Sequence, residues 1–144
     1  MLKFLIGSLL ILAAILVFMF KNASELQMRT IEIKNAKIKA EVASSLPQKF
    51  QGLSGRDFLC ASCGMLFPYE NEQLMNFSMR GMRFPLDFVF IRQGFVVEIR
   101  ENVPAPSEGQ EPQGVYSRVS ANQVLEVNAG FIRSHGIAVG DAVR

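Results

Sequence analysis

The stretch LDFVFIRQGFVVEIRE, residues 86–101, consists of two apolar runs separated by the dipeptide Gln93-Gly94. Runs rich in β-branched and aromatic residues are typical of strands. A two-residue connection that contains glycine joins such strands in an antiparallel hairpin. We therefore predict strands over residues 86–92 and 95–101, paired through a tight turn.

The turn also predicts a register for this hairpin. Counting outward from the turn, Phe88 faces Ile99 on one side of the sheet, and Asp87 faces Arg100 on the other. One face of the hairpin is then apolar and belongs to the core. The other face mixes aliphatic and ionic residues.

The hydrophobic pattern outside the hairpin is also mostly that of strands. Alternation with a period of two predicts a strand pair with a turn near Asn35, further strands, and a last strand ending at Arg144. The predicted strands cover residues 30–33, 37–43, 65–69, 74–80 and 124–127. Thirteen residues rich in proline and glycine, 102–114, form a long surface loop. The sequence predicts a mainly β fold with two short helices, built as a compact closed barrel or sandwich.

Capping signals mark the two short helices. Ser45 and Gln48 have the spacing of a capping box, which predicts a helix that ends near Gly52. Asn128 is the predicted N-cap of a second helix over residues 129–135, and the helix stops at Gly136. His135 then lies in the last turn of that helix, where a cation complements the helix dipole.

The N-terminal region is apolar. Residues 4–20 read FLIGSLLILAAILVFMF, without a charge, between Lys3 and Lys21. Such a run just spans a thin hydrocarbon core. We expect residues 1–21 to form one transmembrane helix that is an anchor or signal-anchor, residues 22–29 a linker, and residues 30–144 a single domain. A cleaved signal peptide and a buried core helix are the alternatives, but no Ala-x-Ala site follows and the run has no polar face.

Charge is distributed unevenly along the chain. Residues 21–51 hold six Lys or Arg against three Glu, whereas residues 52–144 hold eight Arg against ten Asp or Glu. A domain body without a basic stripe does not suggest nucleic-acid binding. The lysines after residues 4–20 favour a cytoplasmic domain by the positive-inside rule, but the order lysine, apolar run, domain is that of an export signal. We expect a single-pass membrane protein with an extracytoplasmic domain, periplasmic or at the cell surface.

The two cysteines of the chain, Cys60 and Cys63, lie in FLCASCGMLF. Outside the cytosol this pair is expected to form a disulfide, which the short spacing permits. Thiol redox activity is an alternative, although a redox motif normally sits at a helix N-terminus that lowers the thiol pKa. The pair and the single His135 fall short of four zinc ligands. We predict no metal and no other cofactor.

Several polar residues interrupt otherwise apolar strands. Buried charges need partners, so such a group is costly unless it is used. We expect these side chains to converge on one sheet face as a ligand-binding pocket under the loop of residues 102–114. An Asp87–Arg100 ion pair with a purely structural role is the alternative. The candidate ligand-binding residues are Arg80, Asp87, Glu98, Tyr116, Glu126 and Asn128.

Blocks of sequence resemble a known family in their order and spacing. The blocks are GLSGR at 52–56, GMLF at 64–67, MRGMRFPLDFVFI at 79–91, VVEIRENVP at 96–104, VLEVNAG at 124–130 and HGIAVGD at 135–141. Together they resemble the bacterial and archaeal domain-of-unknown-function family 192 over residues 30–144. The resemblance implies a small, mainly β domain, often behind a signal peptide or anchor, and no catalytic residue. The chain departs from the family at Ser78, where a tryptophan is usual, and in its Cys-x-x-Cys pair.

The functional expectation follows from these points. We expect an uncharacterised membrane-tethered domain that binds a small ligand or an envelope protein through its polar cluster. Its membrane contact is residues 4–20. The alternatives are thiol redox activity at Cys60 and Cys63, and a structural or interaction module without a small ligand.

Overall fold

The computed structural model describes residues 26–144, so the predicted anchor at residues 1–21 lies outside the described residues, as does much of the predicted linker. Within residues 26–144, no helix is long and apolar enough to cross a membrane. The described chain is mainly β with two short helices, as predicted. Its elements are β1 (Gln27–Ile33), β2 (Ala36–Val42), α2 (Leu46–Gln51), β3 (Cys63–Gln73), β4 (Asn76–Ser78), β5 (Leu86–Arg92), β6 (Phe95–Val103), β7 (Gly114–Tyr116), β8 (Ala121–Asn128) and α3 (Phe131–His135).

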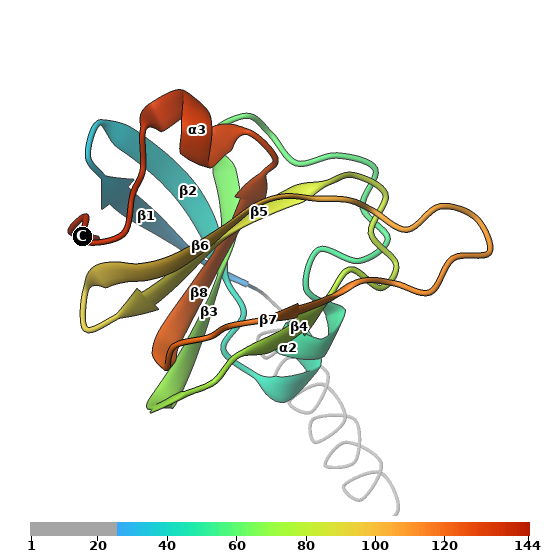
Figure 1. Ribbon diagram of the computed structural model, residues 1–144, viewed down its shortest axis with the longest axis horizontal. Coiled ribbons are helices and arrows are strands. Elements are labelled where there is room, and N and C mark those ends of the chain that lie inside the picture. Colours follow the sequence, from blue (N-terminus) through green and yellow to red (C-terminus); the bar gives the residue numbers. More distant parts are fainter. Residues whose placement is uncertain (1–25) are drawn as a thin grey trace, which may run out of the picture.

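Six strands form one sheet in the order β1-β2-β3-β8-β5-β6, and β4 pairs with β7 in a small second sheet. The predicted hairpin near Asn35 is confirmed, because β1 and β2 pair antiparallel on either side of it. Strands β2 and β3 are parallel. A parallel pair needs a crossover connection, and α2 lies in that connection. Figure 1 shows α2 and the β4–β7 sheet together at one end of the molecule and α3 at the other.

The six-stranded sheet remains open, so the predicted closed barrel is wrong. Its edge strands β1 and β6 do not pair with each other; the C-terminal segment lies between them. Val143 forms an isolated bridge with Ile33 of β1, and Ala142 forms one with Phe95 of β6. The predicted last strand is reduced to these bridges, which join the two edges at one end only.

The turn of the β5–β6 hairpin forms where the sequence predicts it. Gln93 and Gly94 both have positive φ, at 50° and 79°. This backbone twist matches that of the flanking strands in a two-residue hairpin loop. Next to the turn Arg92 pairs with Phe95, as predicted.

Further from the turn the predicted register is wrong. The pairing shifts between Ile91 and Phe90, so that Phe88 opposes Arg100 rather than Ile99. An extra residue in one strand, a β-bulge, produces such a shift. The predicted Asp87–Arg100 pair therefore does not form. A second shift lies closer to the start of β5, near Asn102, which has a positive φ of 55°.

Each face of the six-stranded sheet carries its own core cluster, because successive residues of a strand point to opposite sides. In β5, Val89 and Ile91 join one cluster, which α3 covers. Phe88 and Phe90 join the other. This second cluster, which we call the phenylalanine core, extends to the β4–β7 sheet and includes the buried side chains Leu53, Met65, Phe67, Met75, Met79, Met82 and Val115.

The predicted capping box of α2 is confirmed. The Ser45 hydroxyl accepts from the backbone N–H of Gln48, and the Gln48 side chain accepts from the backbone N–H of Ser45. Gly52 ends the helix at a φ of 50°, as predicted. These signals are local, which is why the sequence predicts this helix closely.

The start of α3 differs from the prediction. Gly130 is the N-cap, in a left-handed conformation with a φ of 84°, and Asn128 is still in β8. Gly136 ends the helix at a φ of 60°, as predicted, and His135 lies in the last turn. The His135 ring stacks on Phe131 with 4.0 Å between ring centroids.

Candidate functional site

The structure separates the six predicted site residues into several environments. In the β5–β8 pairing Asp87 opposes Val127, and Phe88 opposes Glu126. Opposed residues share a face and neighbouring residues do not, so Asp87 and Glu126 point to opposite sides of the sheet. The two carboxyl groups therefore do not share one pocket.

Asp87 connects three elements through its backbone contacts. The side chain is fully buried. One carboxylate oxygen accepts from the backbone N–H of Asn102 at 2.7 Å, and the other accepts from the backbone N–H of Ile132 at 3.0 Å. One oxygen thus accepts a hydrogen bond from β6 and the other from α3. Because Asp87 holds these two elements to β5, we call this arrangement the Asp87 clamp.

Glu98, Arg100 and Tyr116 lie close to one another. The Glu98 carboxylate accepts from the backbone N–H groups of Arg118 at 2.7 Å and Val119 at 3.2 Å. Arg100 forms an ion pair with Glu98 and donates to the Tyr116 carbonyl at 3.4 Å. These contacts hold the connection between β7 and β8 against β6.

Glu126 projects into the phenylalanine core. Its Cα partners across the sheet are Met65 in β3 and Phe88 in β5. Burial in these surroundings raises the pKa of Glu126 to about 8. Tyr69 on the same side has a raised pKa, first through its own burial and then through the charge of Glu126. Glu126 is a carboxyl group that the folded chain favours in its neutral form.

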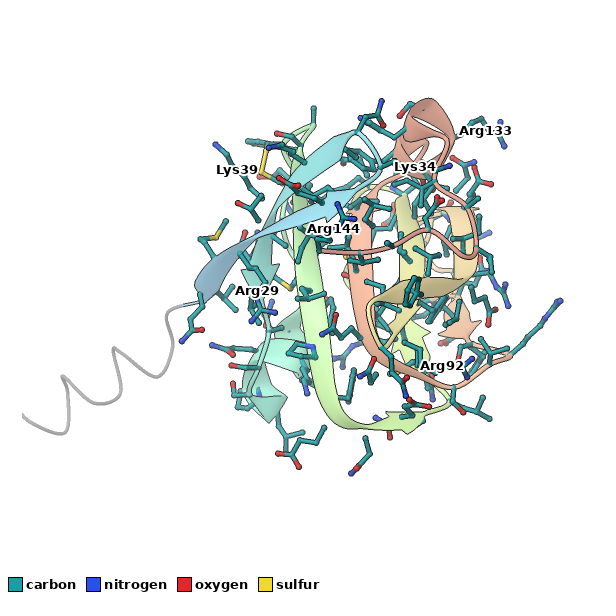
Figure 2. All side chains as sticks on the ribbon, turned by 90° about the vertical axis from the view of Figure 1, so that its left-hand side faces the viewer. Arg29, Lys34, Lys39, Arg92, Arg133 and Arg144 are labelled. Carbon is teal, nitrogen blue, oxygen red and sulfur yellow. A yellow bond between two sulfur atoms is a disulfide. The ribbon has the colours of Figure 1, made fainter. Side chains whose placement is uncertain are left out.

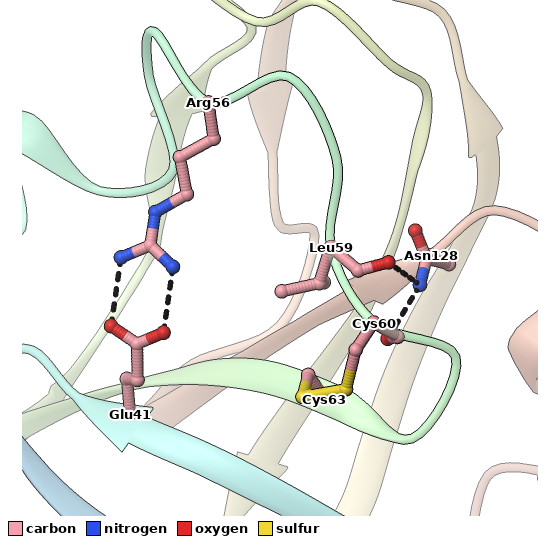
Figure 3. The surroundings of a disulfide bond; sticks show 6 residues. All are labelled: Glu41, Arg56, Leu59, Cys60, Cys63 and Asn128. Atoms are coloured by element: carbon pink, nitrogen blue, oxygen red, sulfur yellow. Dashed lines mark hydrogen bonds and ion pairs between the residues drawn. A yellow bond between two sulfur atoms is a disulfide. The ribbon is translucent and has the colours of Figure 1, made fainter.

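Asn128 holds the loop that carries the cysteines (Figure 3). Cys60 and Cys63 are joined by a disulfide. The Asn128 side-chain amide donates to the carbonyls of Leu59 and Cys60, both at 3.0 Å. The disulfide precedes a strand rather than a helix, so the feature that lowers thiol pKa values in redox motifs is not found at this position.

A bidentate ion pair between Arg56 and Glu41 also supports this loop (Figure 3). Arg56 donates to both carboxylate oxygens of Glu41, at 2.6 and 2.7 Å. The guanidinium lowers the pKa of Glu41 by hydrogen bonding. Together with Asn128, this pair fixes the path of the chain from α2 to β3.

Arg80 lies apart from the other five, in an open groove between α2 and β4 that we call the α2 groove. The groove has a volume of about 690 Å³ and is lined by Leu46, Pro47, Lys49, Phe50, Ser54, Tyr69, Asn76, Phe77, Ser78 and Arg80. The Phe77 ring packs edge-on against the Phe67 ring, with 5.1 Å between the ring centroids. Phe77 therefore connects the groove to the phenylalanine core. Ser78, where the family resemblance leads one to expect tryptophan, is one of the lining residues.

Two cations in the α2 groove lie over aromatic rings. The Lys49 ammonium is 4.0 Å from the centre of the Tyr69 ring, and the Arg80 guanidinium is 4.2 Å from that of Phe50. Stacking of this kind orients a cation while leaving its hydrogen-bond donors available. Burial lowers the pKa of Lys49.

The loop after α2 fixes the position of Arg80. The Ser54 hydroxyl donates to the Arg80 carbonyl at 2.7 Å, and the Gly55 N–H donates to the Gly81 carbonyl at 2.8 Å. Gly81 has a positive φ of 69°, and a side chain there would also press on Ser54. This turn therefore favours glycine for two independent reasons.

The prediction missed the contribution of α2 to this groove. Leu46 and Phe50, four positions apart, are 82% and 72% exposed. That spacing puts both side chains on one helix face, which normally indicates a core contact. This spacing can be read from the sequence, but only the structure shows that the face is largely exposed to solvent. Among residues 26–144, no three His, Cys, Asp or Glu side chains are arranged to hold a metal ion.

The fold is that of a small β domain with an open six-stranded sheet. Its α2 groove is open to solvent and contains two cations, Lys49 and Arg80. Over residues 29–144 the chain matches the DUF192 family, described as "Uncharacterized ACR". The chain belongs to this family, which confirms the resemblance predicted from the sequence blocks. No curated protein is a significant match.

Two solved structures are similar to the chain. A proposed transcription regulator from Sinorhizobium meliloti 1021 has a TM-score of 0.74 and 29% identity, over 83% of this chain and 95% of that one. A protein of unknown function from Novosphingobium aromaticivorans DSM 12444 has a TM-score of 0.73 and 27% identity, over 84% of this chain and 87% of that one.

Proposed function

We propose that the chain is a membrane-tethered, extracytoplasmic domain that binds a small anionic ligand with an apolar part in the α2 groove. The observation that carries this proposal is that Lys49 and Arg80 both stack on aromatic rings within the α2 groove. The proposed binding site is therefore the α2 groove and not the pocket of six polar residues expected from the sequence. Of those six residues, only Arg80 lines the groove.

The chemistry of the lining supports an anion. Lys49 and Arg80 carry positive charge, and none of the lining residues is acidic. A guanidinium and an ammonium together suit a phosphate, sulfonate or carboxylate group. The ligand would bind through hydrogen bonds that the two stacked cations are already oriented to donate.

The same lining supports an apolar part in the ligand. Leu46 and Phe50 are exposed on α2, and Phe77 and Tyr69 are further aromatic residues of the hollow. Binding sites for small molecules are mostly apolar, with a few polar groups that fix orientation. A purely inorganic anion would leave these apolar side chains without a partner.

The tether is proposed from the sequence. Residues 4–20 carry no charge and are long enough for a thin bilayer core. The order lysine, apolar run, domain favours export. A role in transcription is not carried over from the Sinorhizobium protein, because residues 52–144 hold eight Arg against ten Asp or Glu.

A titration with butyl phosphate tests the binding site. The full chain, labelled for nuclear magnetic resonance, is held in phosphatidylcholine nanodiscs so that the ligand meets an uncharged surface. We expect saturable shifts at Tyr69, Ser78 and Arg80, and none at Arg92. Butanol, which lacks the charge, should leave the same signals unshifted. Saturable shifts centred outside the groove, or none at all, would refute the proposal.

A further inference from the structure

Helix α2 presents an apolar face that is largely exposed in the described chain, where the Arg80 guanidinium stacks on the Phe50 ring. None of its residues is buried, although it contains both Leu46 and Phe50. These two side chains, 82% and 72% exposed, lie one helical turn apart on the same face. An apolar helix face flanked by cations is typical of a helix that lies in a membrane interface.

The position of α2 relative to the start of β1 indicates what covers this face. Gln27, at the start of β1, pairs with Val42, at the end of β2. Helix α2 begins only four residues after Val42. The start of β1 and α2 therefore lie at the same end of the domain, as both views show (Figures 1 and 2).

Little chain separates this end of the domain from the uncharged run. Residues 21–25 are all that lie between residues 4–20 and Leu26, which packs against the phenylalanine core. Five residues span at most about 18 Å even when fully extended. If residues 4–20 lie in a bilayer, the α2 end of the domain is held within that distance of its surface.

Charge at this end of the domain suits an anionic surface. Lys49 and Arg80 flank Phe50 in the groove, and Arg29 lies on β1 near its start (Figure 2). Cations close to a bilayer are attracted to anionic headgroups. Apolar side chains and positive charge thus occur together at the tethered end.

We propose that α2 docks on the surface of an anionic phospholipid bilayer, with Leu46 and Phe50 in the headgroup region. The inference rests on the membrane tether of the proposed function, but not on ligand binding in the groove. The tether brings the surface within reach, and the exposed face of α2 provides the contact. The α2 groove then opens at the bilayer surface, where amphiphilic anions are concentrated.

The chain contains no tryptophan, which allows a direct test. The full-length variant Phe50→Trp, reconstituted in vesicles of phosphatidylcholine and phosphatidylglycerol, has one indole on α2. We expect about a twofold loss of its emission when the lipids are replaced by brominated lipids, which quench an indole in the interface. Leu46→Trp is the second reporter, in case the first variant fails to fold.

Phe95→Trp is the matched control. Phe95 is 53% exposed and bridges to Ala142, next to the Val143 contact with the far end of β1. Its indole should keep its emission in the same brominated vesicles. Equal emission from position 50 with and without bromine would overturn the proposal.

Two further measurements separate lipid from other occupants. The charge reversals Lys49→Glu and Arg80→Glu, added to the Phe50→Trp reporter, should reduce quenching in anionic vesicles. If the reporter instead shifts to the blue with rising protein concentration and is not quenched by lipid, a second copy covers α2 and the proposal fails. Because butyl phosphate binding is measured on neutral lipid, failure of that titration leaves the docking result interpretable by itself.

Discussion

The carboxylate of Asp87 accepts a hydrogen bond from the backbone N–H of Ile132 at 3.0 Å, and this contact joins β5 to α3. Its other oxygen accepts from Asn102 at 2.7 Å, where β6 has a positive φ. A residue that the sequence suggested for ligand binding thus satisfies two backbone donors. The side chain of Asp87 has no exposed surface.

Replacement of Asp87 by alanine should destabilise the domain strongly. Two backbone N–H groups would lose a charged acceptor, and each such loss costs about 1.5–3 kcal/mol. We expect the free energy of unfolding to fall by about 3 kcal/mol or more, measured by urea denaturation. Asp87→Asn keeps one acceptor oxygen and should lose less.

Asp57→Ala is the control for this prediction. Asp57 forms an ion pair with Arg83, but its side chain is 78% exposed. Exposed pairs of this kind contribute about 0–1 kcal/mol. If Asp87→Ala were as mild as Asp57→Ala, the clamp described for Asp87 would be wrong.

Glu126 should make stability depend on pH. Burial raises its pKa from 4.5 to about 8 in the folded chain, so the folded state holds a proton that the unfolded state has released between these values. The stabilisation is complete below pH 4.5 and is lost as the pH rises to about 8. The free energy of unfolding should fall in this window by up to about 1.4 kcal/mol per pH unit.

Glu126→Gln isolates this effect, since glutamine has nearly the same shape and no proton to release. Urea denaturation of both proteins at several pH values should give curves that diverge between pH 4.5 and about 8, with the variant increasingly the more stable. Parallel curves would show that Glu126 does not titrate in this way.

Reduction of the Cys60–Cys63 disulfide should weaken the domain without unfolding it. The bond closes a loop with a sequence separation of only 3, for which chain entropy gives about 2 kcal/mol. The Asn128 contacts to Leu59 and Cys60 do not need the disulfide, so the loop should keep its path. Urea denaturation with and without a dithiol measures the loss.

Asn128→Ala tests whether the Asn128 side chain keeps the loop in its path when the disulfide is reduced. In the reduced protein this variant should accelerate amide hydrogen exchange in residues 59–63, because the remaining side-chain support is gone. Unchanged exchange in the reduced variant would mean that Asn128 does not hold the loop.

Local signals explain how much of the fold is predictable from the sequence. The turn at Gln93-Gly94, the capping box at Ser45 and the helix end at Gly136 each depend on a few adjacent residues. The register from Phe90 onward is not predictable, because nothing in an apolar run such as residues 95–97 marks a bulge. Asn102 offered a partial signal, since asparagine tolerates positive φ better than most residues.

The site was harder to predict than the fold, because it depends on which face of an element is covered. Asp87 and Glu126 look alike in sequence, as single acids in apolar strands, yet one is clamped by backbone donors and the other lies among apolar side chains. Likewise, the spacing of Leu46 and Phe50 resembles a core helix. Only the path of the other elements leaves that face open.

The most direct test of the central claim compares the affinity for butyl phosphate of two doubly charge-reversed variants. Lys49→Glu with Arg80→Glu changes the α2 groove, and Arg92→Glu with Arg118→Glu makes the same change in net charge elsewhere. In phosphatidylcholine nanodiscs the account predicts at least about a tenfold increase in Kd for the first variant, because charged contacts are lost, and little change for the second. Equal affinity of both variants and the unmodified chain would contradict the assignment of the α2 groove as the binding site.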